Sequence, residues 1–139
     1  MADVLYAADL HGSRALYEEA VSLASELKAR AVILGGDLAP HGTVPEQRAF
    51  FLDYLVPLLR EYREEGASAD LFYIMGNDDW SANIRVLLES GIERFHYIHG
   101  AVRPLLDDLW VTGLASVSVT PFALKDWERW EEGTKPPAR

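Results

Sequence analysis

The fold of this chain is constrained most by three short apolar segments. Each is followed by a polar loop and then by a helical pattern. They cover residues 4–8, 31–34 and 71–75. Continuous apolar runs of this length are typical of strands buried on both faces of a sheet. Because a helix-forming stretch follows each run, the series predicts a parallel sheet with right-handed crossovers. We therefore expect an α/β fold with a mainly parallel sheet flanked by helices.

The helical patterns between these segments have the apolar spacing of helices that cover a sheet. Residues 14–30 and 46–65 repeat apolar side chains three and four positions apart. Pro57 predicts a kink or a break in the second pattern, and Gly66 predicts its end. A third, shorter helix is expected over residues 81–90.

The last third of the chain predicts shorter elements. Strands are expected at residues 97–98, near 102 and at 109–112, with turns at Pro104 and at Asp107-Asp108, a helix over 122–132 and a frayed tail over 133–139. The spacing of Trp127 and Trp130 would place both on one face of that helix, as a core stripe or as an exposed patch. A length of 139 residues indicates a single domain over 1–139.

The composition limits which residues can bind a metal and which partners the chain can have. The chain has no cysteine, so any metal must be held by oxygen and imidazole ligands. With 13 basic and 22 acidic residues the net charge is −9, which argues against an extended nucleic-acid surface. No apolar run is long enough for a membrane span, and the N-terminus lacks the pattern of a signal peptide. We expect a cytoplasmic protein that does not bind membranes.

Each of the three predicted strands ends in side chains that can bind a metal. Asp9 and His11 follow the first strand with one residue between them, which places both side chains on one side of an extended segment. Asp37 follows the second strand, and Asn77 the third. Because the carboxyl ends of parallel strands open onto one crevice, these side chains are expected to converge there.

Other interpretations of the same residues remain open at this point. The alternative for Asp37 is an N-cap or turn aspartate, and the alternative for Asn77 is a left-handed turn position; both would have to hold together, which weakens them. His41 and Arg14 lie beside the expected crevice and are candidates for contacting substrate, although a solvated loop histidine is an equal alternative. For His96 and His99 we favour structural roles.

In that order and each after an apolar strand, the blocks Asp9-x-His11, Gly35-Gly36-Asp37 and Gly76-Asn77-Asp78-Asp79 resemble those of the calcineurin-like metallophosphoesterases, of the small bacterial and archaeal type. The resemblance continues more weakly through 111–114 and 120–122. It implies the first half of a four-layer αββα sandwich. It also implies hydrolysis of a phosphomonoester or phosphodiester by a metal-activated water, with two divalent ions drawn from Mn, Fe, Zn or Ni.

The resemblance also assigns roles to single residues. Asp9 and His11 would hold the first metal, Asp37 would bridge both, and Asn77 would hold the second. Asp78 and Asp79 are the candidate catalytic residues. Asp78 stands where many relatives have a histidine that assists the leaving group, and Asp79 would fix an imidazole or the loop geometry.

The family's remaining ligands are histidines from later strands, whereas no histidine follows His99 in this sequence. The chain is therefore expected to correspond to the N-terminal portion of the family's domain, without the C-terminal ligand blocks. The alternative function is a non-catalytic protein-binding module on the same scaffold. A homo-oligomer that covers the open sheet is a further expectation.

Overall fold

The computed structural model describes residues 3–122 and 126–130, and its centre is a parallel four-stranded sheet. The strands are β1 (Val4–Ala7), β2 (Ala31–Leu34), β3 (Asp70–Tyr73) and β4 (Phe95–Tyr97), and they lie in the sheet in sequence order. All three neighbouring pairs are parallel. The predicted α/β fold is confirmed.

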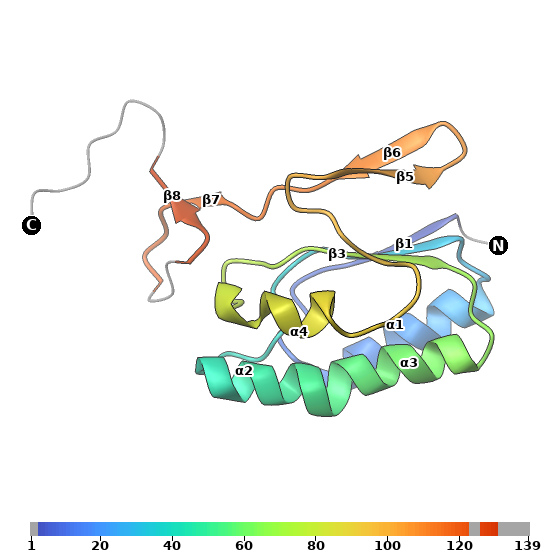
Figure 1. Ribbon diagram of the computed structural model, residues 1–139, viewed down its shortest axis with the longest axis horizontal. Helices are drawn as coiled ribbons and strands as arrows, with labels where there is room; N and C mark the ends of the chain where they lie inside the picture. The colour runs from blue at the N-terminus through green and yellow to red at the C-terminus, as the bar shows by residue number, and fades with distance from the viewer. Residues whose placement is uncertain (1–2, 123–125, 131–139) are drawn as a thin grey trace, which may run out of the picture.

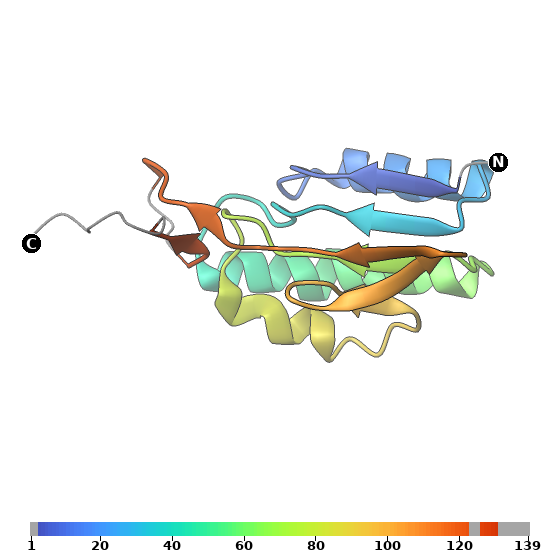
Figure 2. The same ribbon diagram turned by 90° about the horizontal axis from the view of Figure 1, so that it is seen from above.

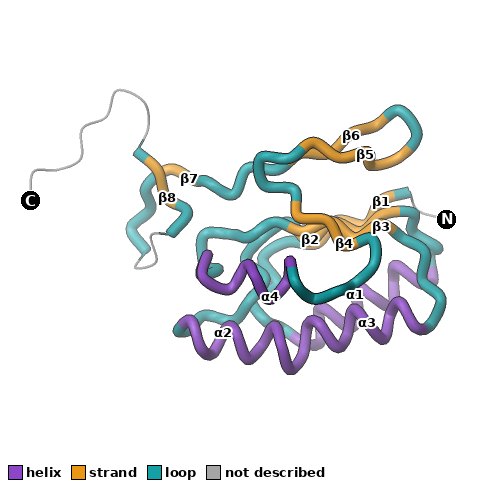
Figure 3. Tube along the Cα trace, in the orientation of Figure 1, coloured by secondary structure: helices purple, strands orange, loops and turns teal. Residues whose placement is uncertain are grey.

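The helices α1 (Arg14–Glu26), α2 (Val44–Phe50), α3 (Val56–Glu64) and α4 (Ile84–Leu88) cover one face of this sheet, as Figures 1 and 3 show. Each crossover steps to the next strand in the same direction, so crossovers of one hand place all of them on one side. Val32, Leu34 and Leu71 face these helices and pack with Tyr17 and Tyr62 in the core.

The second predicted helix is interrupted where proline requires it. A π-helical segment, η1 (Phe51–Leu55), joins α2 to α3, and the N–H of Val56 bonds five residues back to the carbonyl of Phe51. Pro57 follows in the first turn of α3, where its missing N–H costs little. Gly66 ends the helix with φ +91°. The third predicted helix begins as a 3₁₀ turn, η2 (Ser81–Asn83), before α4.

An antiparallel hairpin of β5 (Val102–Leu106) and β6 (Leu109–Thr112) lies over the other face of the sheet (Figure 2). The turn predicted at Asp107-Asp108 is confirmed. The turn predicted at Pro104 is wrong, because Pro104 lies within β5 opposite Trp110, beside a register shift. In the described residues β5 pairs with β6 alone, so a residue without an N–H is tolerated there.

The helix predicted over residues 122–132 is wrong for the part that the structure describes. Two short strands, β7 (Val117–Ser118) and β8 (Glu128–Arg129), pair in parallel instead. The indole N–H of Trp127 donates to the carbonyl of Asp79 at 2.7 Å, and this buried contact overrides the helical spacing. Trp127 is buried and Trp130 is half exposed, so they form no common stripe. The predicted tail over 133–139 lies outside the described residues.

None of the described helices is long and apolar enough to cross a membrane.

Candidate metal centre

The loops after β1 and β2 stay paired beyond the ends of their strands. The N–H of Asp9 donates to the carbonyl of Gly36 at 3.1 Å, and the N–H of His11 donates to the carbonyl of Asp37 at 2.8 Å. The ladder between these strands thus continues into the loops that carry the candidate ligands. This pairing brings together side chains that are 26 to 28 positions apart in the sequence, as their placement at neighbouring strand ends predicted.

The backbone at these ligands adopts an uncommon conformation. Asp9, His11 and Asp37 have φ of +56°, +42° and +50°, in the left-handed region. A non-glycine residue there costs on the order of 1 kcal/mol or more. The described part of the chain contains three further non-glycine residues with positive φ, all in turns elsewhere. Three such residues within two adjoining loops is the concentration of strain that is found at ligand clamps and active sites.

The loop after β3 approaches the loop after β2 so closely that only glycine fits between them. A Cβ atom on Gly76 would lie 2.1 Å from both the backbone N and the Oδ1 of Asp37. The same approach allows the N–H of Asp78 to donate to Asp37 Oδ1 at 2.9 Å. Gly76 therefore has a positional role, because it lets the third block reach the second.

The buried side chain of Asp79 links these two loops from the protein interior. Its carboxylate is fully buried and accepts N–H bonds from Leu38 at 2.9 Å, Ala39 at 2.8 Å and Gly76 at 2.8 Å. Burial raises the pKa of Asp79 to about 6, against the lowering effect of these three bonds. Both oxygens are used by the backbone, and Asp79 does not line the cavity described below. This placement fits the role of fixing the loop geometry.

Gln47 makes a connection that the sequence did not indicate. The side chain lies in the middle of α2 and is fully buried. Its Nε2 donates to the carbonyls of Pro40 at 3.0 Å and Asp78 at 2.7 Å, and its Oε1 accepts from the N–H of Trp80 at 2.8 Å. A glutamine within a helical pattern is ordinarily a solvent-facing residue, so no sequence signal distinguishes this one.

The three loops surround a cavity of about 610 Å³. It is lined by Asp9, His11, Asp37, His41, Gly42, Asn77, Asp78 and Phe122. The structure therefore brings together six of the eight residues that the sequence analysis singled out. The other two are Asp79, behind the loops, and Arg14, whose guanidinium lies 4.7 Å from the ring centroid of Tyr54 and not on the cavity lining.

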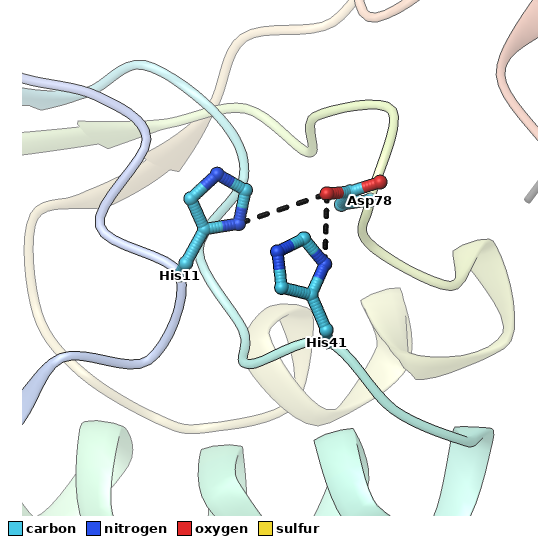
Figure 4. Close-up of side chains that lie close together, drawn as sticks. All are labelled: His11, His41 and Asp78. Atoms are coloured by element: carbon cyan, nitrogen blue, oxygen red, sulfur yellow. Dashed lines mark ion pairs between the residues drawn. The ribbon is translucent and has the colours of Figure 1, made fainter. Parts of the chain in front are cut away.

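Among the described residues two sets of three side chains are placed to hold a cation, and they share His11. Asp9, His11 and Asp37 form one set, and His11, His41 and Asp78 form the other; within each set the ligand atoms lie within 4.8 Å of one another. His11 Nε2 lies 3.9 Å from Asp37 Oδ2, and its Nδ1 lies 3.7 Å from Asp78 Oδ2. His41 Nδ1 lies 3.0 Å from the same oxygen of Asp78 (Figure 4).

The electrostatics of the cavity favour a cation. Its lining contains three carboxylates and neither lysine nor arginine. Burial raises the pKa of Asp37, and the charges of Asp78 and Asp9 raise it further, while the N–H of Asp78 and the ring of His11 act in the opposite direction. His11 Nδ1 is buried without a hydrogen-bond partner. Carboxylate and imidazole donors suit Mn, Fe, Zn or Ni, so this donor set fits a divalent metal.

The two remaining histidines have structural partners, as the sequence analysis favoured. His96 Nε2 lies 3.0 Å from Asp70 Oδ1, on β4 and β3 respectively. His99 Nδ1 accepts the N–H of Ala115 at 2.9 Å. Neither ring lines the cavity.

Comparison with known proteins identifies the fold. No protein-family profile and no curated protein matches the chain. The crystal structure of TT1561 of Thermus thermophilus is similar, with a TM-score of 0.69 at 17% identity over 91% of this chain and 56% of that one. A second crystal structure gives a TM-score of 0.60 at 14% identity, over 91% and 58%. The chain thus spans less than two thirds of either structure, and shares with part of them a parallel α/β fold.

Proposed function

We propose that this chain is a metallophosphoesterase of the calcineurin-like type, a hydrolase that cleaves a phosphomonoester or phosphodiester with a metal-activated water. The observation that carries the proposal is the convergence of Asp9, His11 and Asp37 into one set of ligands at the carboxyl ends of parallel strands. Their order along the chain and the left-handed backbone at all three support it. Independently of this proposal, the chain is an α/β protein with a candidate His/Asp metal site.

In this proposal each residue has a defined task. Asp9, His11 and Asp37 hold a divalent cation, which when bound lowers the pKa of a water and offsets the negative charge of the phosphoryl oxygens. Asp37 is oriented for this by the N–H of Asp78, which holds its Oδ1 and leaves Oδ2 on the side of His11. Asn77 faces the same cavity, where a phosphate ester has room to enter.

The test uses metal-stripped protein with Mn²⁺ added back and bis-p-nitrophenyl phosphate or p-nitrophenyl phosphate as substrate. We expect hydrolysis that requires Mn²⁺. Asp37→Asn should lower it by at least about 100-fold, since losing even an outer partner of a metal ligand costs about 10- to 100-fold. Asp108→Asn, on the exposed hairpin turn, is the matched control and should retain the activity. Equal rates for the Asp37 variant and the wild type would contradict the proposal.

A second candidate function is a non-catalytic binding module, and the hairpin favours it. The outer face of the hairpin carries Val102, Pro104 and Trp110, all exposed to solvent. On the sheet itself Tyr6 of the edge strand β1 is 65% exposed. Apolar side chains gathered this way suit contact with another protein, including a second copy of the chain. Light scattering across a concentration series tests self-association, and a strict monomer at every concentration argues against the second copy.

A further inference from the structure

A buried amide joins the two loops that carry Asp37 and Asp78. The side chain of Gln47 lies on the buried side of α2 with that of Phe50, while its two neighbours in the chain are exposed. Burying a glutamine costs free energy unless the protein bonds its amide. Both ends of the amide are bonded here, its Nε2 to two carbonyls and its Oε1 to one N–H.

The two donors of this amide reach different loops. One bonds the carbonyl of Pro40, in the loop after β2, and the other bonds the carbonyl of Asp78, in the loop after β3. The two N–H groups of an NH₂ group lie in one plane at a fixed angle, so a side chain that uses both fixes the spacing of its partners. The same spacing decides whether the N–H of Asp78 reaches Asp37 Oδ1, which it does at 2.9 Å.

We propose that Gln47 is a positioning residue for Asp37, to which the proposed function, on which this inference rests, gives a place in the metal site. Gln47 acts through the backbone of Asp78. It holds the carbonyl of this residue, and the N–H of the same residue holds Asp37 Oδ1. Oδ2 then stays on the side of His11, 3.9 Å from its Nε2. A carboxylate held in this way presents one oxygen to a cation without rearranging, which favours binding.

Gln47 bonds groups that Asp79 cannot bond. The carboxylate of Asp79 links the same two loops through backbone N–H groups, whereas the amide links them through carbonyls. An ionised carboxylate only accepts hydrogen bonds, so the carbonyls of Pro40 and Asp78 require a different side chain. A glutamate in place of Gln47 would supply a donor only while it is protonated.

The experiment compares two buried amides, of which only one bonds both loops. Asn83 is also fully buried, and its Nδ2 donates to the carbonyl of Val44 at 3.0 Å, away from the cavity lining. Gln47→Glu and the matched control Asn83→Asp each replace a buried NH₂ group by oxygen. The electron paramagnetic resonance signal of free Mn²⁺ measures the Mn²⁺ affinity of the metal-stripped full chain between pH 6 and pH 8. Urea denaturation measures the unfolding free energy without metal.

We expect Gln47→Glu to bind Mn²⁺ about 10-fold more weakly than the wild type at pH 8. The difference should shrink toward pH 6, because a buried glutamate takes up a proton and regains one donor. Gln47→Met, which has no donor at any pH, should bind more weakly than the wild type by the same factor throughout. Asn83→Asp should lose unfolding free energy and keep the Mn²⁺ affinity of the wild type.

Circular dichroism of each variant checks that it is folded, and Gln47→Met carries the test if Gln47→Glu is not. Gln47 variants that bind Mn²⁺ as tightly as Asn83→Asp would overturn the positioning role. A wild type that binds Mn²⁺ but hydrolyses neither p-nitrophenyl substrate would instead remove the proposed function, and the comparison of Mn²⁺ affinities would still decide the role of Gln47.

Discussion

Aspartates lie at both ends of the parallel strands, and their surroundings are opposite. At the amino ends, Arg94 holds Asp70 through two bonds of 3.1 and 2.6 Å, and Arg30 holds Asp107 through two bonds of 3.0 and 2.9 Å. The bond from Arg94 lowers the pKa of Asp70. At the carboxyl ends, burial raises the pKa of Asp37, which has no such partner among the residues that line the cavity.

The two ends differ in whether an arginine of the chain compensates the charge of the carboxylate. A carboxylate with a bidentate arginine has its charge compensated in the folded chain. Carboxylates that lie close together without a cation repel one another, which lowers the stability of the fold. Groups with pKa values shifted in this way concentrate at functional sites. The same residue type therefore has two surroundings here, one with an arginine partner and one without.

The largest effect we expect comes from the buried carboxylate behind the site. Asp79→Ala removes the acceptor of three buried N–H groups, those of Leu38, Ala39 and Gly76. An unsatisfied buried donor costs about 1–3 kcal/mol, so the loss of unfolding free energy should be about 3 kcal/mol or more. Urea denaturation of the metal-free protein measures it.

Asp79→Asn sharpens this result. The amide oxygen of the asparagine still accepts a hydrogen bond, but its NH₂ group faces an N–H donor. The unfolding free energy should therefore lie between those of the wild type and Asp79→Ala. Asp108→Ala, at an exposed position, should change the unfolding free energy little. An Asp79→Ala protein as stable as this control would show that the carboxylate does not tie the loops together.

Much of this architecture was predictable because it depends on local patterns. Residues 31–34 form a strand as the apolar run predicted, and the convergence of Asp9 and Asp37 follows from parallel pairing alone. What was missed depends on contacts that no spacing encodes. Gln47 forms hydrogen bonds to residues of two other loops. The position of Trp127 is set by its hydrogen bond to Asp79, and not by the helical spacing in the sequence. The approach of His41 to Asp78 likewise exists only once three loops are assembled.

The pH dependence of stability distinguishes the two ends of the sheet. The folded pKa of Asp79 is raised from 3.8 to about 6, so its contribution is fully present below about pH 3.8 and is lost as the pH rises through about 6. That difference corresponds to about 3 kcal/mol at most. The folded pKa of Asp70 is lowered, so its contribution is present above about pH 3.8 and is lost as the pH falls through the folded value.

We therefore expect the unfolding free energy of the metal-free protein to decrease from pH 4 to pH 7, and to decrease again in strong acid. Urea denaturation with a chelator at each pH measures both limbs. Asp79→Asn should flatten the first limb, and Asp70→Asn should flatten the second. A free energy that rises steadily from pH 4 to pH 7 would show that the buried carboxylate is not the group that dominates the titration.

The smallest effect compares one aspartate from each end. Asp70→Asn should lower the unfolding free energy of the metal-free protein by at most about 1 kcal/mol, because the ion pair of Asp70 with Arg94 is partly exposed. The loss should be smaller at high salt, which screens the pair. Asp37→Asn should cost nothing or add stability, since it removes a charge that Asp9 and Asp78 disfavour and keeps an acceptor for the N–H of Asp78. Saturating Mn²⁺ should stabilise Asp70→Asn as much as the wild type, because only a ligand that binds the folded state adds stability, and should stabilise Asp37→Asn much less. The two variants could instead lose the same unfolding free energy without metal and gain the same amount with Mn²⁺. That result would mean that the two ends of the sheet do not differ in the way their charges indicate.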